Sequence, residues 1–163
     1  MSKYQYILLF PLIGSLLAGL LGRYIGKRPS QLIAIAGLIF SFIISMQAFR
    51  YVIAEEGNVI HEVIFSWIFS GEFKVSFGML IDRITVIMLI VVTGISSLIH
   101  IYSLGYMDED PDNPRFFSYL SFFTFSMLML IIGDNFLQLF FGWEGVGLAS
   151  YLLIGFWFKK AGR

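Results

Sequence analysis

The sequence predicts an all-α membrane protein with five transmembrane helices and a small β-hairpin outside the membrane. Hydrophobic residues make up 58% of the 163 positions and charged residues only 13%, whereas a soluble domain is about half apolar and a quarter charged. Five stretches stay apolar over about 19 residues, which is enough to cross the hydrocarbon core. One further stretch alternates apolar and polar residues, as a half-buried strand does.

The five predicted helices leave little sequence for a soluble domain, so we expect a single membrane domain over residues 1–163. At 1.5 Å per residue, each helix spans about 30 Å of hydrocarbon. In the first helix, Gly14, Ala18 and Gly22 recur every four residues and predict a face for close helix packing. The helices are expected at residues 4–21, 32–53, 84–101, 116–132 and 136–158.

The strand pattern lies in the longest connection, residues 54–83. Phe73, Val75 and Phe77 alternate with polar residues, and Ser70 and Gly71 separate this run from an earlier apolar run. Two such runs around a glycine-containing turn predict a β-hairpin. We expect this hairpin to cover helix ends or to contact a neighbouring protein.

The later connections predict where helices begin and end. Asn113 and Pro114 are typical of an N-cap and a first helical residue, so the fourth helix should begin there. Gly133 and Asn135 offer a C-cap and the next N-cap, so the last two helices should form a tight antiparallel pair. The acidic stretch 108–112 lacks the glycine and the final glutamate of a calcium loop, so we expect no metal site there.

The charges exclude several classes of protein and predict an orientation. Eleven basic and eleven acidic residues leave no net charge, which removes the electrostatic case for nucleic acid, and the absence of cysteine excludes disulfides and thiolate ligands. The positive-inside rule favours an external N-terminus and an internal C-terminus. The inner side then holds Arg23, Lys27, Arg28, Arg115, Lys159, Lys160 and Arg163, and the outer side Lys3, Arg50, Lys74 and Arg83.

Glu144 is the residue that most needs a chemical explanation. It lies eight residues after Phe136, about 12 Å into the fifth helix, and no other charge occurs between Asn135 and Lys159. An ionised carboxylate in the membrane is costly, so it must be paired, hydrated or protonated. Burial disfavours the charged form of the carboxyl group and a nearby lysine would favour it. A group under both influences would exchange a proton near neutral pH. The sequence therefore predicts a proton relay, and the alternative is an inert polar contact between helices.

The third predicted helix carries a second polar line. Thr93, Ser96, Ser97 and His100 recur at spacings of three and four, so they share one face. His100, expected at the inner end of the helix, is a second candidate for moving protons. The alternative is a histidine that only satisfies its own hydrogen bonds.

Two segments resemble a known family. They are "VIMLIVVTGISSLIHIYSLGYM" and "RFFSYLSFFTFSMLMLIIGDNFLQLFFGWEGVGLASYLLIGFW", and the resemblance is strong over residues 77–157. They resemble the N-terminal part of subunit L of the proton-pumping NADH-quinone oxidoreductase (complex I), called chain 5 in mitochondria. The resemblance implies an antiporter-like helical bundle, with Glu144 at the family's proton-channel carboxylate and His100 at a histidine of its third-helix motif. It also implies a bacterial or mitochondrial inner membrane.

The resemblance further implies what lies on other chains. NADH, FMN, the iron–sulfur clusters and quinone are expected on other subunits of the complex, so no cofactor is expected on this chain. The family continues for several hundred residues and supplies a lysine that partners the carboxylate. We therefore expect a fragment or split half that needs other membrane subunits, including one that carries the missing helices. The alternatives are a piece of a multi-subunit sodium/proton antiporter, or a structural membrane subunit without transport.

Overall fold

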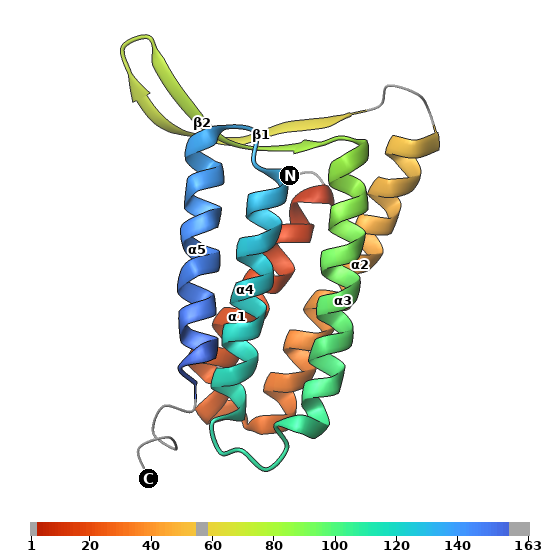
Figure 1. Ribbon diagram of the computed structural model, residues 1–163, viewed down its shortest axis with the longest axis vertical. Helices are drawn as coiled ribbons and strands as arrows, with labels where there is room; N and C mark the ends of the chain where they lie inside the picture. Colours follow the sequence, from red (N-terminus) through yellow and green to blue (C-terminus); the bar gives the residue numbers. More distant parts are fainter. Residues whose placement is uncertain (1–2, 55–58, 157–163) are drawn as a thin grey trace.

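The computed structural model describes residues 3–54 and 59–156, and it contains five long helices and one β-hairpin (Figure 1). A short 3-10 turn, Lys3–Gln5, precedes the first helix. The five helices are all long and apolar enough to cross a membrane, so the five expected spans are confirmed. The elements are α1 (Tyr6–Ile25), α2 (Lys27–Ala54), β1 (Ile60–Ser70), β2 (Phe73–Ile81), α3 (Arg83–Tyr106), α4 (Asn113–Ile132) and α5 (Phe136–Ile154).

Several helices extend beyond the expected apolar windows. α2 begins at Lys27, directly after Gly26, whose φ of 93° is a left-handed conformation that glycine adopts without strain. α3 continues to Tyr106, so His100 lies inside the helix rather than at its inner end. The extra turns contain polar residues. They remain helical because the backbone hydrogen bonds of a helix do not have to stop where the hydrocarbon region ends. The expected end of the fifth helix at residues 157–158 lies outside the described residues.

The expected N-cap of α4 is wrong by one residue. α4 begins at Asn113, Pro114 lies in its first turn, and Asp112 takes the cap position without a capping side-chain hydrogen bond. Asn113 instead points inward: its side-chain oxygen accepts a 2.8 Å hydrogen bond from Gln31, and its amide donates to the carbonyl of Met107. The side chain is unavailable as a cap because it joins α2 to the α3–α4 loop.

The helices stand side by side with α5 at the edge of the bundle (Figure 1). α1 packs against both α2 and α4, α3 packs against α2, and α5 packs mainly on α4. Gly14, Ala18 and Gly22 are buried, and a Cβ added at Gly14 would meet the backbone of Ala34 at 3.4 Å. The predicted small-residue face of the first helix is therefore confirmed. The rest of the described chain buries 17% of the apolar window of α5, against 39% for α4.

A proline in α1 is compensated by a side chain of α2. Pro11 has no backbone N–H, so the carbonyl of Ile7, four residues earlier, loses its intrahelical donor. The hydroxyl of Ser41 donates a 3.0 Å hydrogen bond to that carbonyl. Backbone groups in a membrane must be satisfied within the protein. This contact therefore allows the proline inside a spanning helix.

The expected β-hairpin is confirmed, and it lies across one end of the bundle with its tip projecting past α5 (Figure 1). The strands pair antiparallel from Ile60 opposite Ile81 to Ser70 opposite Phe73, with two register irregularities in β1. Gly71 has a φ of 59°, which suits the turn between the strands. The buried residues at the base of the hairpin join the apolar core at the upper ends of the helices; this core includes Ile7, Val52, Ile60, Met79, Ile81, Leu89 and Met129.

Candidate functional site

Glu144 lies near the middle of α5, on the side of the helix that the other four leave open. Its side chain is exposed, and it borders a cavity of about 420 Å³ between α4 and α5. The lining of this cavity is mostly apolar and aromatic, and includes Phe122, Phe125, Ser126 and Met129 from α4. The Glu144 carboxylate therefore borders a cavity whose α4 wall carries one polar side chain among the described residues, that of Ser126.

Two of the three glycines that flank Glu144 bring α5 against α4. A Cβ added at Gly142 would lie 2.8 Å from the backbone nitrogen of Leu130, and one at Gly145 would lie 2.6 Å from Ser126 Oγ. Gly147 faces open space. Because Gly142 and Gly145 pack on α4, Glu144 is held at the edge of this contact. Gly142 and Gly145 therefore allow the close approach of α5 to α4.

Glu144 is not neutralised by the part of the chain that the structure describes. Within residues 3–54 and 59–156, it makes neither a hydrogen bond nor an ion pair, and it is not buried by the five helices. No other charged residue occurs in α5. A charged group facing hydrocarbon would cost several kcal/mol. Among residues 3–54 and 59–156, no group on the open face of α5 compensates this cost.

His100 has the opposite environment. It is fully buried between α3 and α4, edge-on to Phe117 with ring centroids 5.9 Å apart. Its Nδ1 lies 2.7 Å from the carbonyl oxygen of Ser96, which only accepts, so Nδ1 carries a hydrogen. In the neutral ring, Nε2 is then the acceptor, and Ser121 Oγ, 3.1 Å away, donates to it. Both ring nitrogens are occupied, and the tautomer is fixed.

The predicted polar line on α3 is confirmed as one face, and it meets hydroxyl groups of α4. Thr93 and Ser97 are buried and donate to carbonyls one turn earlier in their own helix. Thr124 Oγ1 lies 3.1 Å from Ser96 Oγ across the helix contact. The partners Ser121 and Thr124 were not predicted, although their spacing of three on the fourth helix is a usable signal.

The two candidate residues do not come together. His100 lies in the contact between α3 and α4, whereas Glu144 borders the cavity between α4 and α5. In Figure 1, α4 stands between α3 and α5. Among the described residues, no three His, Asp or Glu side chains gather as a metal site would need. The arrangement provides two separate polar positions on either side of one helix.

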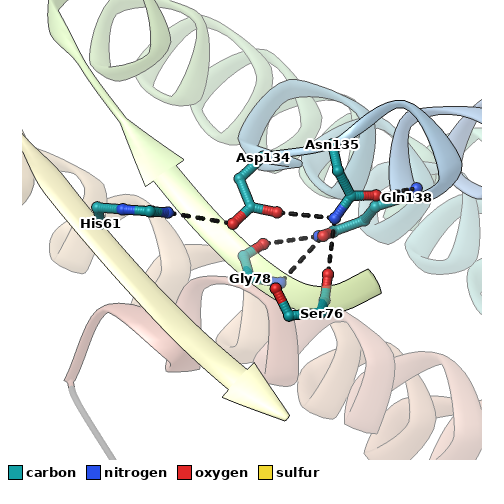
Figure 2. Close-up of polar contacts among 6 residues, drawn as sticks. All are labelled: His61, Ser76, Gly78, Asp134, Asn135 and Gln138. Carbon is teal, nitrogen blue, oxygen red and sulfur yellow. Dashed lines mark hydrogen bonds and ion pairs between the residues drawn. The ribbon is translucent and has the colours of Figure 1, made fainter. Parts of the chain in front are cut away.

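The hairpin is fastened to the start of α5 by a cluster of side-chain to backbone hydrogen bonds (Figure 2). Gln138 pairs with both backbone groups of Gly78: its Oε1 accepts from the Gly78 nitrogen at 3.0 Å, and its Nε2 donates to the Gly78 oxygen at 2.7 Å. Asn135 Nδ2 donates to the carbonyl of Ser76 at 2.6 Å. Asn135 also caps α5 as predicted, because its Oδ1 accepts from the Gln138 backbone nitrogen at 2.9 Å.

A contact between His61 and Asp134 completes this cluster, which we call the hairpin clamp (His61, Ser76, Gly78, Asp134, Asn135 and Gln138). His61 Nε2 lies 3.2 Å from Asp134 Oδ2. A Cβ at Gly78 would lie 2.8 Å from the backbone oxygen of Glu62 and would also meet the Asp134 carboxylate, so this position favours glycine. The clamp was not predicted from the sequence. It fixes the first turn of α5, where Gln138 lies six residues before Glu144.

A family model described as "NADH-Ubiquinone oxidoreductase (complex I), chain 5 N-terminus" matches residues 67–117. The chain is 55% identical over 157 residues to NADH-ubiquinone oxidoreductase chain 5 of Arabidopsis thaliana, which covers 96% of this chain and 23% of the relative. It is 53% identical over 154 residues to NADH-quinone oxidoreductase subunit L of Rickettsia conorii, covering 94% of this chain and 23% of that one.

By sequence, the chain is similar to chain 5 and subunit L of complex I, and the family model that it matches describes the N-terminus of chain 5. It is also 48% identical over 161 residues to subunit L of Neisseria meningitidis, covering 98% of this chain and 24% of the relative. The chain thus spans about a quarter of the length of these family members. The expected resemblance is confirmed over nearly all of the chain, including the first two helices.

A solved structure shares the fold. A chain of the membrane-bound sulfane sulfur reductase, an archaeal respiratory membrane complex, superimposes with a TM-score of 0.76 at 18% identity, and the match covers 92% of this chain and 30% of that chain. The shared fold supports the antiporter-like helical bundle that the resemblance implies.

Proposed function

We propose that this chain forms the first part of a membrane subunit of NADH-quinone oxidoreductase that moves protons across the membrane, with Glu144 as a relay carboxylate. The observation that carries the proposal is the placement of Glu144. It lies midway along a membrane-spanning helix, exposed on the face that the rest of the chain leaves open, beside a cavity shared with α4. A carboxylate in such a position exchanges protons when water or a basic group reaches it.

The open face of α5 fits a subunit that is completed by further helices. Family members are about four times as long as this chain, by the share of their length that it covers. A basic side chain from such helices would neutralise Glu144 and let its proton move on. The completing helices come either from the same polypeptide or from another membrane subunit, and these are the partners that we propose.

Within the proposal, the chain itself carries no redox step. NADH, FMN, iron–sulfur clusters and quinone would belong to other subunits, and this chain would contribute transport to the enzyme. His100 is proposed only as a secondary proton-holding position. Its two nitrogens are bonded to Ser96 and Ser121, so a proton reaches it through the Ser121 hydroxyl.

The proposed orientation places the hairpin and the α4–α5 turn outside. These elements lie at the same end of the bundle as the N-terminal end of α1 (Figure 1). The opposite end carries Lys27 and Arg28, both within 4 Å of Asp108. An excess of basic residues on the inner side is the usual arrangement.

The decisive experiment is Glu144→Gln in the assembled complex, reconstituted in vesicles. Glutamine keeps the shape and hydrogen bonding of the side chain but does not bind a transferable proton. We expect assembly and uncoupled NADH oxidation to stay near wild type. Proton uptake measured with a pH-sensitive dye should fall about tenfold or more, because loss of a proton-transfer group costs at least this much.

The matched control is Glu109→Gln, which removes an exposed carboxylate in the loop before α4 and should leave proton uptake unchanged. Glu144→Asp keeps an ionisable group and should retain part of the transport. Wild-type proton uptake in Glu144→Gln would assign Glu144 a packing role and overturn the proposal.

A further inference from the structure

The hairpin clamp contains a side chain that the proposed proton transfer does not use. His61 lies near the start of β1, and its side chain is 58% exposed. Its neighbour Ile60 is buried in the apolar core, so His61 is on the face of the strand that points away from the helices. Histidine is the side chain that ordinarily changes charge between about pH 5 and pH 8. A charge change at this position would therefore occur within the hairpin clamp.

The partner of His61 is a carboxylate that is largely enclosed. Asp134 lies in the α4–α5 turn, and its side chain is 10% exposed. One carboxylate oxygen, Oδ1, accepts from Asn135 Nδ2 at 2.9 Å, and the other, Oδ2, lies 3.2 Å from His61 Nε2 (Figure 2). A carboxylate only accepts, so Nε2 carries the hydrogen in this contact. Protonation of the ring keeps this hydrogen bond and adds a positive charge beside the carboxylate, which makes the contact stronger.

Asp134 is the one charged group that contacts His61 among the described residues. Glu62 is next to His61 in β1, but neighbouring side chains of a strand point to opposite faces, so Glu62 is turned toward the helices. Asp82 and Arg83 follow the end of β2, where the Asp82 carboxylate caps α3. The first turn of α5 contains no charged residue. Protonation of His61 is therefore expected to act on its contact with Asp134.

This contact joins the hairpin to the α4–α5 turn beside the other bonds of the clamp. The backbone N–H of Gly78, in β2, donates to the side chain of Gln138 in α5, and the Gly78 carbonyl accepts from the same side chain. Both bonds break when the base of the hairpin leaves α5, so exchange of the Gly78 amide hydrogen reports this separation. A stronger contact between His61 and Asp134 favours the docked hairpin and slows that exchange.

We propose that His61 and Asp134 form an acid-responsive contact that holds the hairpin on the start of α5. When the pH falls, His61 gains a proton and the contact becomes an ion pair, so docking takes up protons and is favoured. When the pH rises, His61 loses its charge and a neutral hydrogen bond remains, so the hairpin undocks more often. The orientation proposed above places this contact on the side to which protons are delivered. The hairpin would then be held most firmly when a proton gradient is present, and this last step alone rests on the proposed function.

The test measures amide hydrogen exchange in the assembled complex in nanodiscs, at about pH 8 and about pH 5.5, near the two ends of the range in which histidine titrates. Exchange of the peptide that contains Gly78 is divided by the intrinsic exchange rate at each pH, so that the resulting protection reports docking. In the wild type, protection should be about threefold higher at the lower pH, the gain expected for one partly exposed ion pair. His61→Gln keeps a polar side chain that does not titrate, so its protection should be the same at both pH values.

Two further variants sharpen the result. Asp134→Asn removes the charge of the carboxylate but keeps an acceptor oxygen, so it should also abolish the pH response. The matched control is Glu72→Gln, which removes an exposed carboxylate at the hairpin turn, outside the clamp, and should keep the wild-type response. If Asp134→Asn does not assemble, the wild type and His61→Gln decide, because the His61 side chain is mostly exposed and its replacement leaves the core intact.

Equal protection of the wild type at both pH values would overturn the proposal. So would a pH response that His61→Gln retains, since another group would then cause it, or a weaker protection at the lower pH. None of these outcomes bears on proton transfer at Glu144, which is tested separately.

Discussion

The two candidate residues, His100 and Glu144, have contrasting surroundings on either side of α4. His100 is fully buried, and both of its ring nitrogens are hydrogen-bonded, one to Ser96 and one to Ser121. Glu144 is exposed and has no bonding partner within the described chain. The comparison indicates that the described helices satisfy the polar groups of His100 and leave Glu144 without a partner among the described residues. Substitutions on the closed side should therefore affect folding, and substitutions at Glu144 should affect transport.

The largest expected effect on stability is at the clamp end of α5. Gln138→Leu would leave the buried backbone N–H and C=O of Gly78 without partners, which should destabilise the chain by about 3 kcal/mol. Unfolding in mixed detergent, followed by circular dichroism, measures the change. Protease cleavage within the hairpin should increase in parallel. Equal unfolding curves and equal cleavage would show that the strands hold their position without the clamp.

The packed and open faces of α5 differ at two glycines. Gly142→Ala would place a Cβ 2.8 Å from the Leu130 backbone, so α5 must move away from α4, at a cost of about 2 kcal/mol. Gly147→Ala is the control, because a Cβ there meets nothing within 4 Å, and this change should be neutral or slightly stabilising. The same unfolding assay measures both. If the two variants were equally stable, the described contact between α4 and α5 would be wrong.

The central comparison is tested by His100→Leu against Glu144→Gln. Leucine would remove the partner of the buried Ser121 hydroxyl, so His100→Leu should lower the free energy of unfolding by about 1.5 kcal/mol. Glu144→Gln should not destabilise the chain, because Glu144 makes no hydrogen bond or ion pair among the described residues and glutamine brings no charge into the apolar phase. Thermal unfolding of the two variants in the same detergent provides the measurement. The reverse order of stabilities would contradict the distinction between a closed and an open site.

The smallest expected effect is a pH dependence at the start of α3. The Thr85 backbone N–H donates to the Asp82 carboxylate and holds the pKa of Asp82 below its usual value. This cap therefore stabilises α3 above the unfolded pKa of about 4, and the contribution is lost as the pH falls through the lowered folded pKa. The loss should be about 1 kcal/mol. Asp82→Asn keeps an acceptor oxygen without titrating, so its acid unfolding should lack this contribution.

The sequence predicts the number and order of helices because an apolar window of about 19 residues suffices to identify a span. It predicts the helix ends less well, because polar residues also continue a helix at the membrane surface, as Lys27 does in α2. The hairpin follows from the alternation around Gly71. The two register irregularities in β1 do not, since they depend on how the strands meet the bundle.

The site was predicted in part. Glu144 is identifiable because it is the one charge in a long apolar run, and the face of α3 that carries His100 follows from its spacing. The exposure of Glu144 depends on which helix covers α5, which no local pattern specifies. Gln138 was missed because its two hydrogen bonds reach a glycine 60 residues away, and glycine gives no periodic signal.

The clamp also bears on how the chain is made. Translation completes the hairpin before the α4–α5 turn exists, so the Gly78 backbone groups must stay hydrated until Gln138 has been synthesised and inserted. The hairpin can therefore settle on the bundle only when the fifth helix has entered the bilayer. A ribosome stalled before that point would hold a nascent chain with an undocked hairpin, which a protease on that side of the membrane could cut.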